Sequence, residues 1–190
     1  MRKKDKKRLF VAVDMPAVVV QEIARVQDII KREALFEGKF VDPKQVHLTV
    51  KFIGEVPTEQ LPFIEKALAV IKGKTMEAQL GSLDVFAAGN RIKIIFLSLV
   101  CSELADLAQK VEQALLPWCP AEKRSFVTHA TIARIKWLEN ENKERLLGLL
   151  RKLSVKPLQF TIDSFVLKES ELSEKGPIYI DKERYKLDSN

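Results

Sequence analysis

The sequence predicts an α+β fold of two pseudo-symmetric lobes, in which antiparallel sheets flanked by helices face each other across a central groove. Apolar residues alternate in some segments and recur at helical spacing in others, in the order strand-helix-strand-helix-strand-strand-helix-strand-helix-strand-strand. One short motif also occurs once in each half, each time on a strand between two helices. The halves therefore resemble a degenerate duplication, and two layered α+β lobes satisfy that order. We treat residues 1–190 as a single bilobal domain.

In the first half, alternating apolar residues predict strands at 8–14 and 46–53, and helical spacing predicts a helix after each of them, to about residues 35 and 71. Gly54 and Pro57 are expected to end the second strand, and Thr58 to cap the helix that follows. Two further strands, 76–86 and 91–100, are joined by a hairpin-like loop. On the second strand, strict alternation buries Leu48, Val50 and Phe52 and places His47, Thr49 and Lys51 on the opposite face.

In the second half, Ser102 is expected to cap a helix that ends before Pro117. A strand at 126–135 and a helix that begins at Asn140 follow. The last two strands are expected at 157–167 and 178–185, separated by a polar loop that ends in Gly176 and Pro177.

The repeated motif contains the only two histidines of the chain. It reads His47-Leu48-Thr49-Val50 in the first half and His129-Ala130-Thr131-Ile132 in the second. A threonine two places after both histidines is expected by chance in roughly 1 of 1,000 such chains, which is rare for a short motif. On a strand, residues i and i+2 share a face, so each copy presents an imidazole and a hydroxyl side by side.

Two such strands, if they meet, bring together the groups that phosphoryl transfer needs. Of two facing imidazoles, one can act as base and the other as acid near neutral pH. The hydroxyls of Thr49 and Thr131 can donate hydrogen bonds to an oxyanion. His47 and His129 are therefore the candidate catalytic residues, and neither a nucleophilic side chain nor a metal is required.

Other chemistries fit the sequence less well. A zinc site needs three or four ligands from His, Cys, Asp or Glu, and no acidic residue or cysteine has ligand spacing to either histidine. There is no G-x-S-x-G motif of a serine hydrolase and no glycine-rich phosphate loop. We expect no metal and no cofactor.

The motifs and their surroundings resemble the 2H phosphoesterase superfamily, and most closely its LigT-like RNA 2′,3′-cyclic phosphodiesterases, historically named 2′-5′ RNA ligases. The segments 8–14, 47–54 and 129–134 resemble the opening strand and the two motifs of that family. The segment 167–179 resembles its C-terminal strand-loop-strand. Thr128 departs from the family, in which many relatives have Pro before the second histidine. The resemblance covers about residues 8 to 185.

The resemblance implies hydrolysis of a terminal 2′,3′-cyclic phosphate on RNA to a 2′-phosphate, with reverse 2′-5′ ligation by the same chemistry. It implies that His47 protonates the 3′-oxygen, that His129 activates water, and that Arg134 binds phosphate or substrate. Strict alternation places Arg134 opposite His129, so a bulge or the strand end must turn it back, or it is a surface residue. Lys51 is a further candidate for substrate binding. Phe10 is expected to pack beneath the motif rather than to stack on a base.

Composition supports a folded chain with an anionic partner. Hydrophobic residues make up 46% and charged residues 31%, with a net charge of +6, which excludes a disordered chain and suits RNA. We expect RNA with 2′,3′-cyclic phosphate ends, including tRNA fragments, as the partner, and a cytoplasmic monomer without a membrane span. Residues 1–7 are expected to be a basic, frayed terminus, and Cys101 and Cys119 reduced thiols.

Two alternatives stay open on the sequence. One is a related enzyme that acts on small cyclic nucleotides or on an ADP-ribose cyclic phosphate. The other is a non-catalytic module that binds RNA 3′ ends, whose affinity would weaken with salt.

Overall fold

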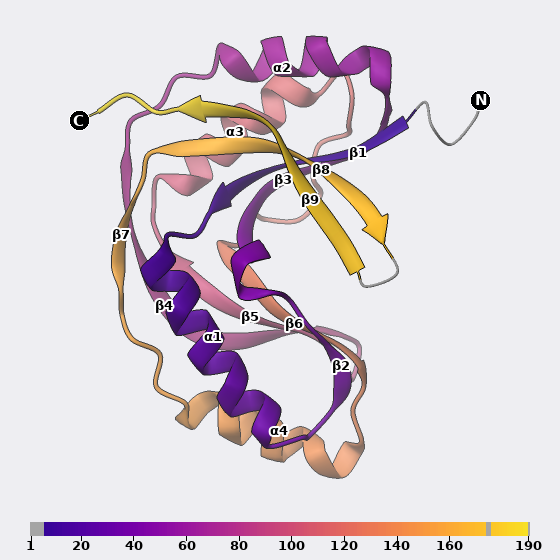
Figure 1. Cartoon of the computed structure of the whole chain (residues 1–190), viewed down its shortest axis with the longest axis vertical. Helices are drawn as coiled ribbons and strands as arrows, with labels where there is room; N and C mark the ends of the chain where they lie inside the picture. Colours follow the sequence, from indigo (N-terminus) through magenta and orange to yellow (C-terminus); the bar gives the residue numbers. More distant parts are fainter. Residues whose placement is uncertain (1–5, 174–175, 190) are drawn as a thin grey trace.

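The computed structural model describes residues 6–173 and 176–189. Its centre is a curled antiparallel sheet of nine strands, in the spatial order β7-β4-β5-β6-β3-β1-β8-β9, with β2 paired to β6 (Figure 1). The strands are β1 (Lys6–Asp14), β2 (Glu37–Phe40), β3 (His47–Pro57), β4 (Met76–Ala88), β5 (Arg91–Val100), β6 (His129–Trp137), β7 (Gln159–Ile162), β8 (Ser164–Ser173) and β9 (Gly176–Lys186).

The two predicted lobes are confirmed, and they are joined through the two motif strands. Within the described residues, β3 and β6 pair at one position, where Leu48 lies opposite Ala130. Strands β1, β8 and β9 extend the sheet beyond β3, and β5, β4 and β7 extend it beyond β6. Leu48 and Ala130 each lie between the histidine and the threonine of their motif, so the junction of the lobes holds both motifs next to each other.

The helices lie at opposite ends of the molecule, with α2 and α3 at one end and α1 and α4 at the other (Figure 1). Helix α1 follows β1 but packs near β6, and α3 follows β5 but packs on β3. Gln27 of α1 is fully buried, and its amide donates to the carbonyl oxygens of Val41 and Ile132. Each lobe is thus completed by a helix from the other half of the chain. The helices are α1 (Ala17–Arg32), α2 (Leu61–Ala69), α3 (Leu104–Leu115) and α4 (Asn140–Lys152).

The hydrophobic core lies between the helices and the sheet. Strand β1 is buried from Leu9 to Val13 and lies in the sheet between β3 and β8; Leu9, Val11 and Val13 belong to the core, whereas Phe10 lines the groove. Burial of these apolar side chains stabilises the fold by about 25 cal/mol per Å² of apolar surface removed from water. None of the described helices is long and apolar enough to cross a membrane.

Several predicted boundaries are wrong. Lys6 and Lys7 begin β1, and Lys7 forms an ion pair with Glu169 at 2.6 Å, so the frayed terminus does not include them; the first five residues lie outside the described part. Strand β3 continues through Gly54, which adopts φ +90°. The predicted strand 157–167 is divided at Asp163 into β7 and β8.

Strand β2 and two helix starts also differ from prediction. Strand β2 is missing from the predicted elements because three of its four residues are exposed and it lacks an apolar alternation. A short 3-10 turn precedes α2, so Thr58 does not cap that helix, and Ser102 does not cap α3. Cys101 and Cys119 are buried and unpaired, and burial raises the pKa of both thiols.

Candidate active site

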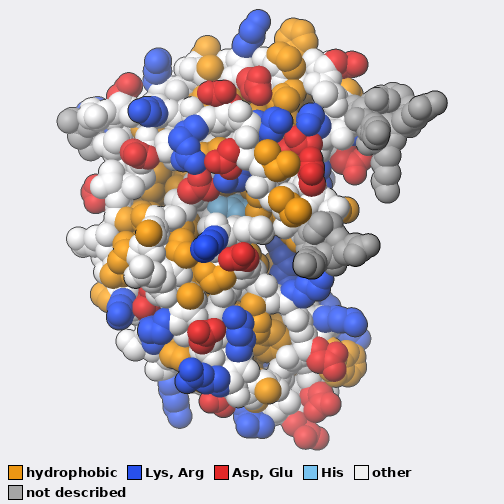
Figure 2. All heavy atoms as spheres, viewed as in Figure 1, with side chains coloured by type: hydrophobic (Ala, Val, Ile, Leu, Met, Phe, Trp, Pro, Cys, Tyr) orange, Lys and Arg blue, Asp and Glu red, His pale blue; other side chains and the backbone are white. Residues whose placement is uncertain are grey.

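The two motifs line one cavity of about 440 Å³ in the groove between the lobes. Both histidines and both motif threonines line it, as the sequence predicts. Histidine atoms are visible near the centre of the molecular face in Figure 2. The lining also includes Arg8, Phe10, Gln45, Phe52, Arg134 and Tyr179, and none of the described lining residues is acidic. The cavity therefore suits an anion.

Both imidazoles are held in the same way. The Nδ1 of His47 lies 2.8 Å from the carbonyl oxygen of Gln45, and the Nδ1 of His129 lies 2.7 Å from that of Val127. A carbonyl oxygen can only accept, so each Nδ1 carries the hydrogen and donates it. In the neutral ring, Nε2 is then the atom that is free to accept a proton. The partner is two residues before the histidine in both halves, which makes the arrangement pseudo-symmetric.

Aromatic rings fix the planes of the imidazoles. The ring of His47 lies 4.9 Å from Phe10 and 5.0 Å, edge to face, from Tyr179. The ring of His129 lies 4.8 Å, edge to face, from Phe86 and 5.3 Å from Phe96. Phe10 is 3% exposed, so the prediction that it packs beneath the motif is confirmed.

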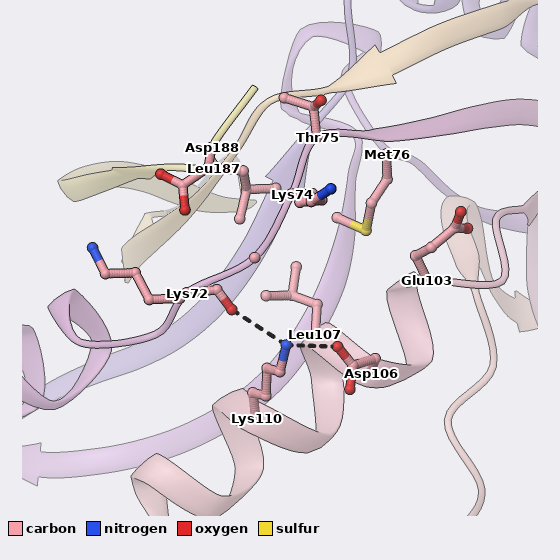
Figure 3. Close-up of a pocket in the computed structure, with 11 residues that line it drawn as sticks. Lys72, Lys74, Thr75, Met76, Glu103, Asp106, Leu107, Lys110, Leu187 and Asp188 are labelled. Atoms are coloured by element: carbon pink, nitrogen blue, oxygen red, sulfur yellow. Dashed lines mark hydrogen bonds and ion pairs between the residues drawn. The ribbon is translucent and has the colours of Figure 1, made fainter. Parts of the chain in front are cut away.

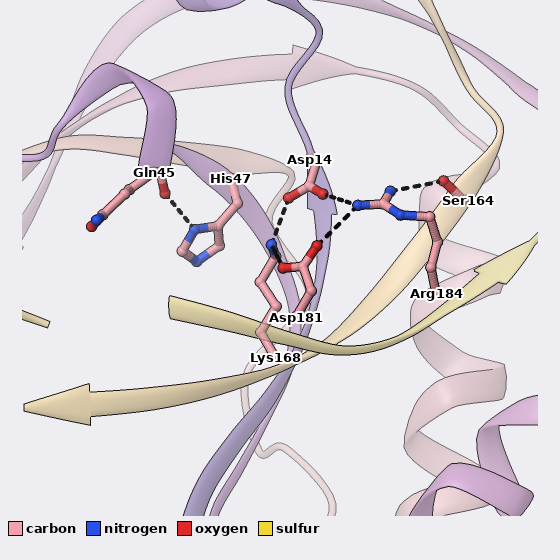
Figure 4. A network of polar contacts seen from close by, with 7 residues as sticks. All are labelled: Asp14, Gln45, His47, Ser164, Lys168, Asp181 and Arg184. Atoms are coloured by element: carbon pink, nitrogen blue, oxygen red, sulfur yellow. Dashed lines mark hydrogen bonds and ion pairs between the residues drawn. The ribbon is translucent and has the colours of Figure 1, made fainter. Parts of the chain in front are cut away.

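A charged network lies beside His47 (Figure 4). Lys168 of β8 is buried and forms ion pairs with Asp14, at 2.9 Å, and with Asp181. The Nη2 of Arg184 lies 2.6 Å from the Oδ2 of Asp14 and 3.1 Å from the Oδ2 of Asp181, so it forms ion pairs with the same two carboxylates. Although burial alone would raise the pKa of Asp14, its bonds to Arg184 and Lys168 outweigh this and lower it.

The environment of His47 favours its neutral form. Burial is the main cause that lowers the pKa of this imidazole, and the charges of Lys168 and Arg134 act in the same direction. The bond to the Gln45 carbonyl and the charge of Asp14 oppose the shift without cancelling it. In the free protein at neutral pH, His47 is therefore a neutral ring with an available Nε2.

Arg134 reaches the groove because β6 contains a bulge. Ile95 pairs with Ala133 and Phe96 with Thr131, so Ile132 has no partner on β5. This extra residue shifts the alternation by one, and Arg134 returns to the face of His129 and Thr131. A bulge is one of the two ways, with the strand end, in which the sequence allows Arg134 to turn back to the face of His129. No described carboxylate forms an ion pair with Arg134, so its charge is available in the cavity.

The equivalent bulge in β3 corrects the prediction for Lys51. Val11 pairs with Lys51 and Ala12 with Thr49, so Val50 is the unpaired residue. The alternation shifts after Val50, which buries Lys51 and exposes Phe52 to the groove. The Nζ of Lys51 donates to Glu112 at 2.9 Å and to the Pro120 carbonyl at 3.0 Å, and its side chain is 2% exposed. Lys51 does not line the groove cavity, and Phe52 is not a core residue.

Sequence reasoning misses part of this site. It places Phe52 in the core and does not include the anchoring carbonyls of Gln45 and Val127. A signal exists for the carbonyls, because each histidine opens its strand and the residue two places earlier is a natural backbone partner. For Phe52 there is none, because a bulge cannot be read from alternation alone.

Another cavity, of about 490 Å³, lies away from the motifs (Figure 3). Among its lysines, Lys72 and Lys74 are exposed, and Lys110 forms an ion pair with Asp106 at 2.7 Å and donates to the Lys72 carbonyl at 3.3 Å. No motif residue lines it. Among residues 6–173 and 176–189, no three side chains of His, Cys, Asp or Glu cluster as metal ligands.

Comparison with known proteins identifies the family of this chain. Residues 13–96 and 100–179 match the family model described as LigT like Phosphoesterase. The RNA 2′,3′-cyclic phosphodiesterase of Methanothermobacter thermautotrophicus is 31% identical over 186 residues, which cover 96% of this chain and 100% of that protein. The protein of the same name from Methanocaldococcus jannaschii is 30% identical, over 90% of this chain and 96% of its own length.

A solved structure shares the fold. The crystal structure of TT0787 of Thermus thermophilus superposes with a TM-score of 0.78 at 26% identity, covering 96% of this chain and 98% of that one. The match spans both lobes, and the family model matches a segment of each half. The resemblance seen in the sequence is thus confirmed, and the chain belongs to the family of LigT-like phosphoesterases.

Proposed function

We propose that this protein hydrolyses the 2′,3′-cyclic phosphate at the 3′ end of RNA to a 2′-phosphate, with His47 and His129 as its acid–base pair. One observation carries the proposal: both rings donate from Nδ1 to a backbone carbonyl and line one cavity without described carboxylates. The names of the archaeal relatives support RNA 2′,3′-cyclic ends as the substrate.

In the proposed reaction, the two imidazoles move one proton each. One neutral Nε2 takes a proton from water as the water oxygen bonds to phosphorus. The other ring, as imidazolium, gives its proton to the 3′-oxygen as the bond between phosphorus and that oxygen breaks. The net change is addition of water across one ester bond. With a ribose 5′-hydroxyl in place of water as the attacking group, the same steps form a 2′-5′ linkage and release the 3′-hydroxyl.

The family resemblance gives His129 the role of base and His47 the role of acid. The lowered pKa of His47 acts against this role in the free protein, because an acid must carry its proton. A bound phosphodiester anion favours the charged form of a neighbouring imidazole. We therefore propose that His47 gains its proton when substrate binds, so that the enzyme becomes competent only with phosphate in the groove.

Thr49, Thr131 and Arg134 are proposed to hold the phosphate. Each threonine shares the groove face of its histidine, and each hydroxyl can donate to a non-bridging oxygen. Arg134 adds a charge-assisted contact from β6. Positioning and electrostatic stabilisation of this kind account for most of the catalysis in phosphoryl transfer. We propose that no metal takes part, because hydroxyl and imidazole pairs alone do not form a metal-ligand set.

The direct test is the product of a short RNA that ends in a 2′,3′-cyclic phosphate, incubated with the protein and EDTA. We expect a terminal 2′-phosphate, identified by its resistance to enzymes that require a 3′-phosphate end. A 3′-phosphate product, or loss of activity with EDTA, would contradict the mechanism. Turnover of small cyclic nucleotides alone would change the substrate, and RNA binding without turnover would indicate a binding module.

A further inference from the structure

Strands β5 and β6 continue past the groove toward the start of α4. Ile94 of β5 and Arg134 of β6 line the groove cavity. Lys93 and Lys136, which are farther from the motifs on the same two strands, line a separate cavity of about 390 Å³. Strand residues advance by about 3.4 Å each, so Lys136 lies roughly 7 Å beyond Arg134 along β6. A polymer held at Arg134 can therefore extend into this second cavity.

Pairing between β2 and β6 aligns side chains on the face of Arg134. Lys39 of β2 lies directly opposite Arg134, and residues that are opposite in a ladder point to the same side of the sheet. Lys136 has no partner on β2, so Glu37 lies opposite Trp137. Glu37 and Lys39 are two residues apart and share a face, which places Trp137 on the groove side with Arg134.

A bulge in β5 has the same effect on the next strand. Ile94 lies opposite Arg134, on the groove side. Lys93 has no partner on β4, because Ile94 and Ile92 take successive partners there. The alternation shifts by one, so Ile92 is buried and Arg91 comes to the groove side. We define the strand-end platform as Lys39, Arg91, Lys93, Lys136 and Trp137.

The strand-end platform carries uncompensated positive charge. Its four cations are exposed, and none of them forms an ion pair within residues 6–173 and 176–189. The carboxylates beside it are those of Glu37 and Glu139. Lysine and arginine side chains gather over β2 and β6, to the right of the molecular face in Figure 2. The platform therefore attracts a polyanion.

The other end of the groove, at β1 and β8, differs in its charges. Arg8 lies opposite Glu55 in the ladder of β1 and β3. Lys7 and Lys182 both form ion pairs with Glu169, at 2.6 Å and 3.4 Å. These cations have carboxylate neighbours, whereas those of the strand-end platform form no described ion pair. The charges thus favour the β6 end as the path by which a polyanion leaves the groove.

Trp137 adds an aromatic surface to the cations of the platform. It is 58% exposed and lines the second cavity together with Arg91, Lys93 and Lys136. Surfaces that bind single-stranded nucleic acid combine a cationic track for the backbone with aromatic side chains on which bases stack. The strand-end platform has both components, and Arg134 connects it to the groove.

We infer that the strand-end platform binds the nucleotides that precede the cyclic end of the RNA, with its cations on their phosphates and Trp137 against one of their bases. The inference rests on the proposed function, because it places the cyclic phosphate in the groove beside Arg134. A cyclic mononucleotide ends in the groove and does not reach the platform. The platform therefore selects RNA over small cyclic nucleotides.

The first test compares KM for 2′,3′-cyclic AMP with KM for a six-nucleotide RNA that ends in a 2′,3′-cyclic phosphate. We expect KM to be at least about 5-fold higher for the mononucleotide. Trp137→Ala should lower this ratio of KM values by about 5- to 150-fold, the contribution of one stacked base, whereas Trp137→Phe should keep most of it. Phe63 of α2 is the matched control, because it is 56% exposed and lines neither cavity, so Phe63→Ala should leave the ratio unchanged.

The second test measures binding without turnover, as the Kd of the same RNA, labelled with a fluorophore, for the His129→Ala protein at several salt concentrations. Each contact between a lysine and a phosphate of a single strand contributes about 0.7 to the slope of log K against log salt. Adding Lys39→Gln and Lys136→Gln should therefore make the slope shallower by about 1.4. Lys66→Gln, which removes an exposed lysine of α2, should not change it.

The outcomes separate this inference from the proposed function. Equal KM values for the two substrates with wild-type protein, or a ratio and a salt slope that the platform variants leave unchanged, would overturn the platform and leave the proposed function intact. An equal rise of both KM values in Trp137→Ala would also overturn it, because the residue would then act on the groove. Absence of turnover of both substrates would overturn the proposed function, while the Kd values would still report on the platform.

Discussion

Replacement of Lys168 tests whether the charged network beside His47 controls that residue. Lys168→Met keeps the length and apolar stem of the side chain but removes a buried charge. The charge of Lys168 disfavours a proton on His47, so its loss should raise the pKa of His47. Asp14→Asn should lower that pKa, because the carboxylate of Asp14 acts in the opposite direction.

The cost of Lys168→Met in stability follows from the contacts that remain. Breaking a buried ion pair costs about 3–5 kcal/mol when the partner charge is orphaned, and an exposed pair costs about 1 kcal/mol or less. Asp14 and Asp181 keep Arg184, and their side chains are 36% and 48% exposed. We therefore expect a loss of about 1–2 kcal/mol, or a fall in Tm of roughly 5 °C for a chain of this size.

Nuclear magnetic resonance measures the effect directly, because the protein has only two histidines and His129→Ala assigns both signals. The pKa of His47 is followed through its Cε1–H resonance in wild type, Lys168→Met and Asp14→Asn. Lys110→Met, which removes an ion-paired lysine far from the motifs, is the matched control. Shifts of the same sign in the two network variants, or an equal shift in the control, would refute the reasoning.

Three further predictions concern the motif threonines, the buried lysine and the pH dependence of stability. Thr49→Ala and Thr131→Ala should each lower kcat on cyclic-phosphate RNA by about 10²- to 10³-fold, while the Ser variants keep most activity; an effect on KM alone would exclude stabilisation of the transition state. Lys51→Met should lower the free energy of unfolding by about 2 kcal/mol, measured with urea, and leave KM unchanged, because the buried ammonium donates hydrogen bonds to Glu112 and to the Pro120 carbonyl. A rise in KM at unchanged stability would instead indicate that Lys51 binds substrate. The free energy of unfolding should fall as pH drops below about 6.5, because His47 binds a proton more readily in the unfolded chain than in the folded protein. In urea titrations between pH 8 and 5, His47→Gln should lack the part of this fall that is due to His47.

The motif pair and the lobes could be predicted because they depend on local patterns. Thr49 and Thr131 follow their histidines at strand spacing, and this spacing fixes the shared face whatever the rest of the chain does. The meeting of the two strands followed from the duplication and from the family resemblance. The structure brings His47, His129, Thr49, Thr131 and Arg134 to one cavity.

The errors arise where distant segments decide the local structure. The bulge at Val50 reverses the predicted faces of Lys51 and Phe52, and it depends on the pairing of β3 with β1. The buried partner of Lys51, Glu112, lies 61 residues away on another element. The packing of α1 and α3 on the lobe formed by the other half of the chain also depends on distant segments, because the spacing of apolar residues in α1 does not show which lobe the helix covers. Alternation predicts a face, but only tertiary pairing shows where one residue interrupts it.

The central claim is that His47 and His129 act together as one acid–base unit, and a double-mutant cycle tests it most directly. We would measure kcat/KM on cyclic-phosphate RNA for wild type, His47→Ala, His129→Ala and the double variant, with folding checked by thermal unfolding. The account predicts a loss of about 10²- to 10⁴-fold or more in each single variant, and little further loss in the double variant. Near wild-type activity in either single variant, or fully multiplicative losses, would contradict it.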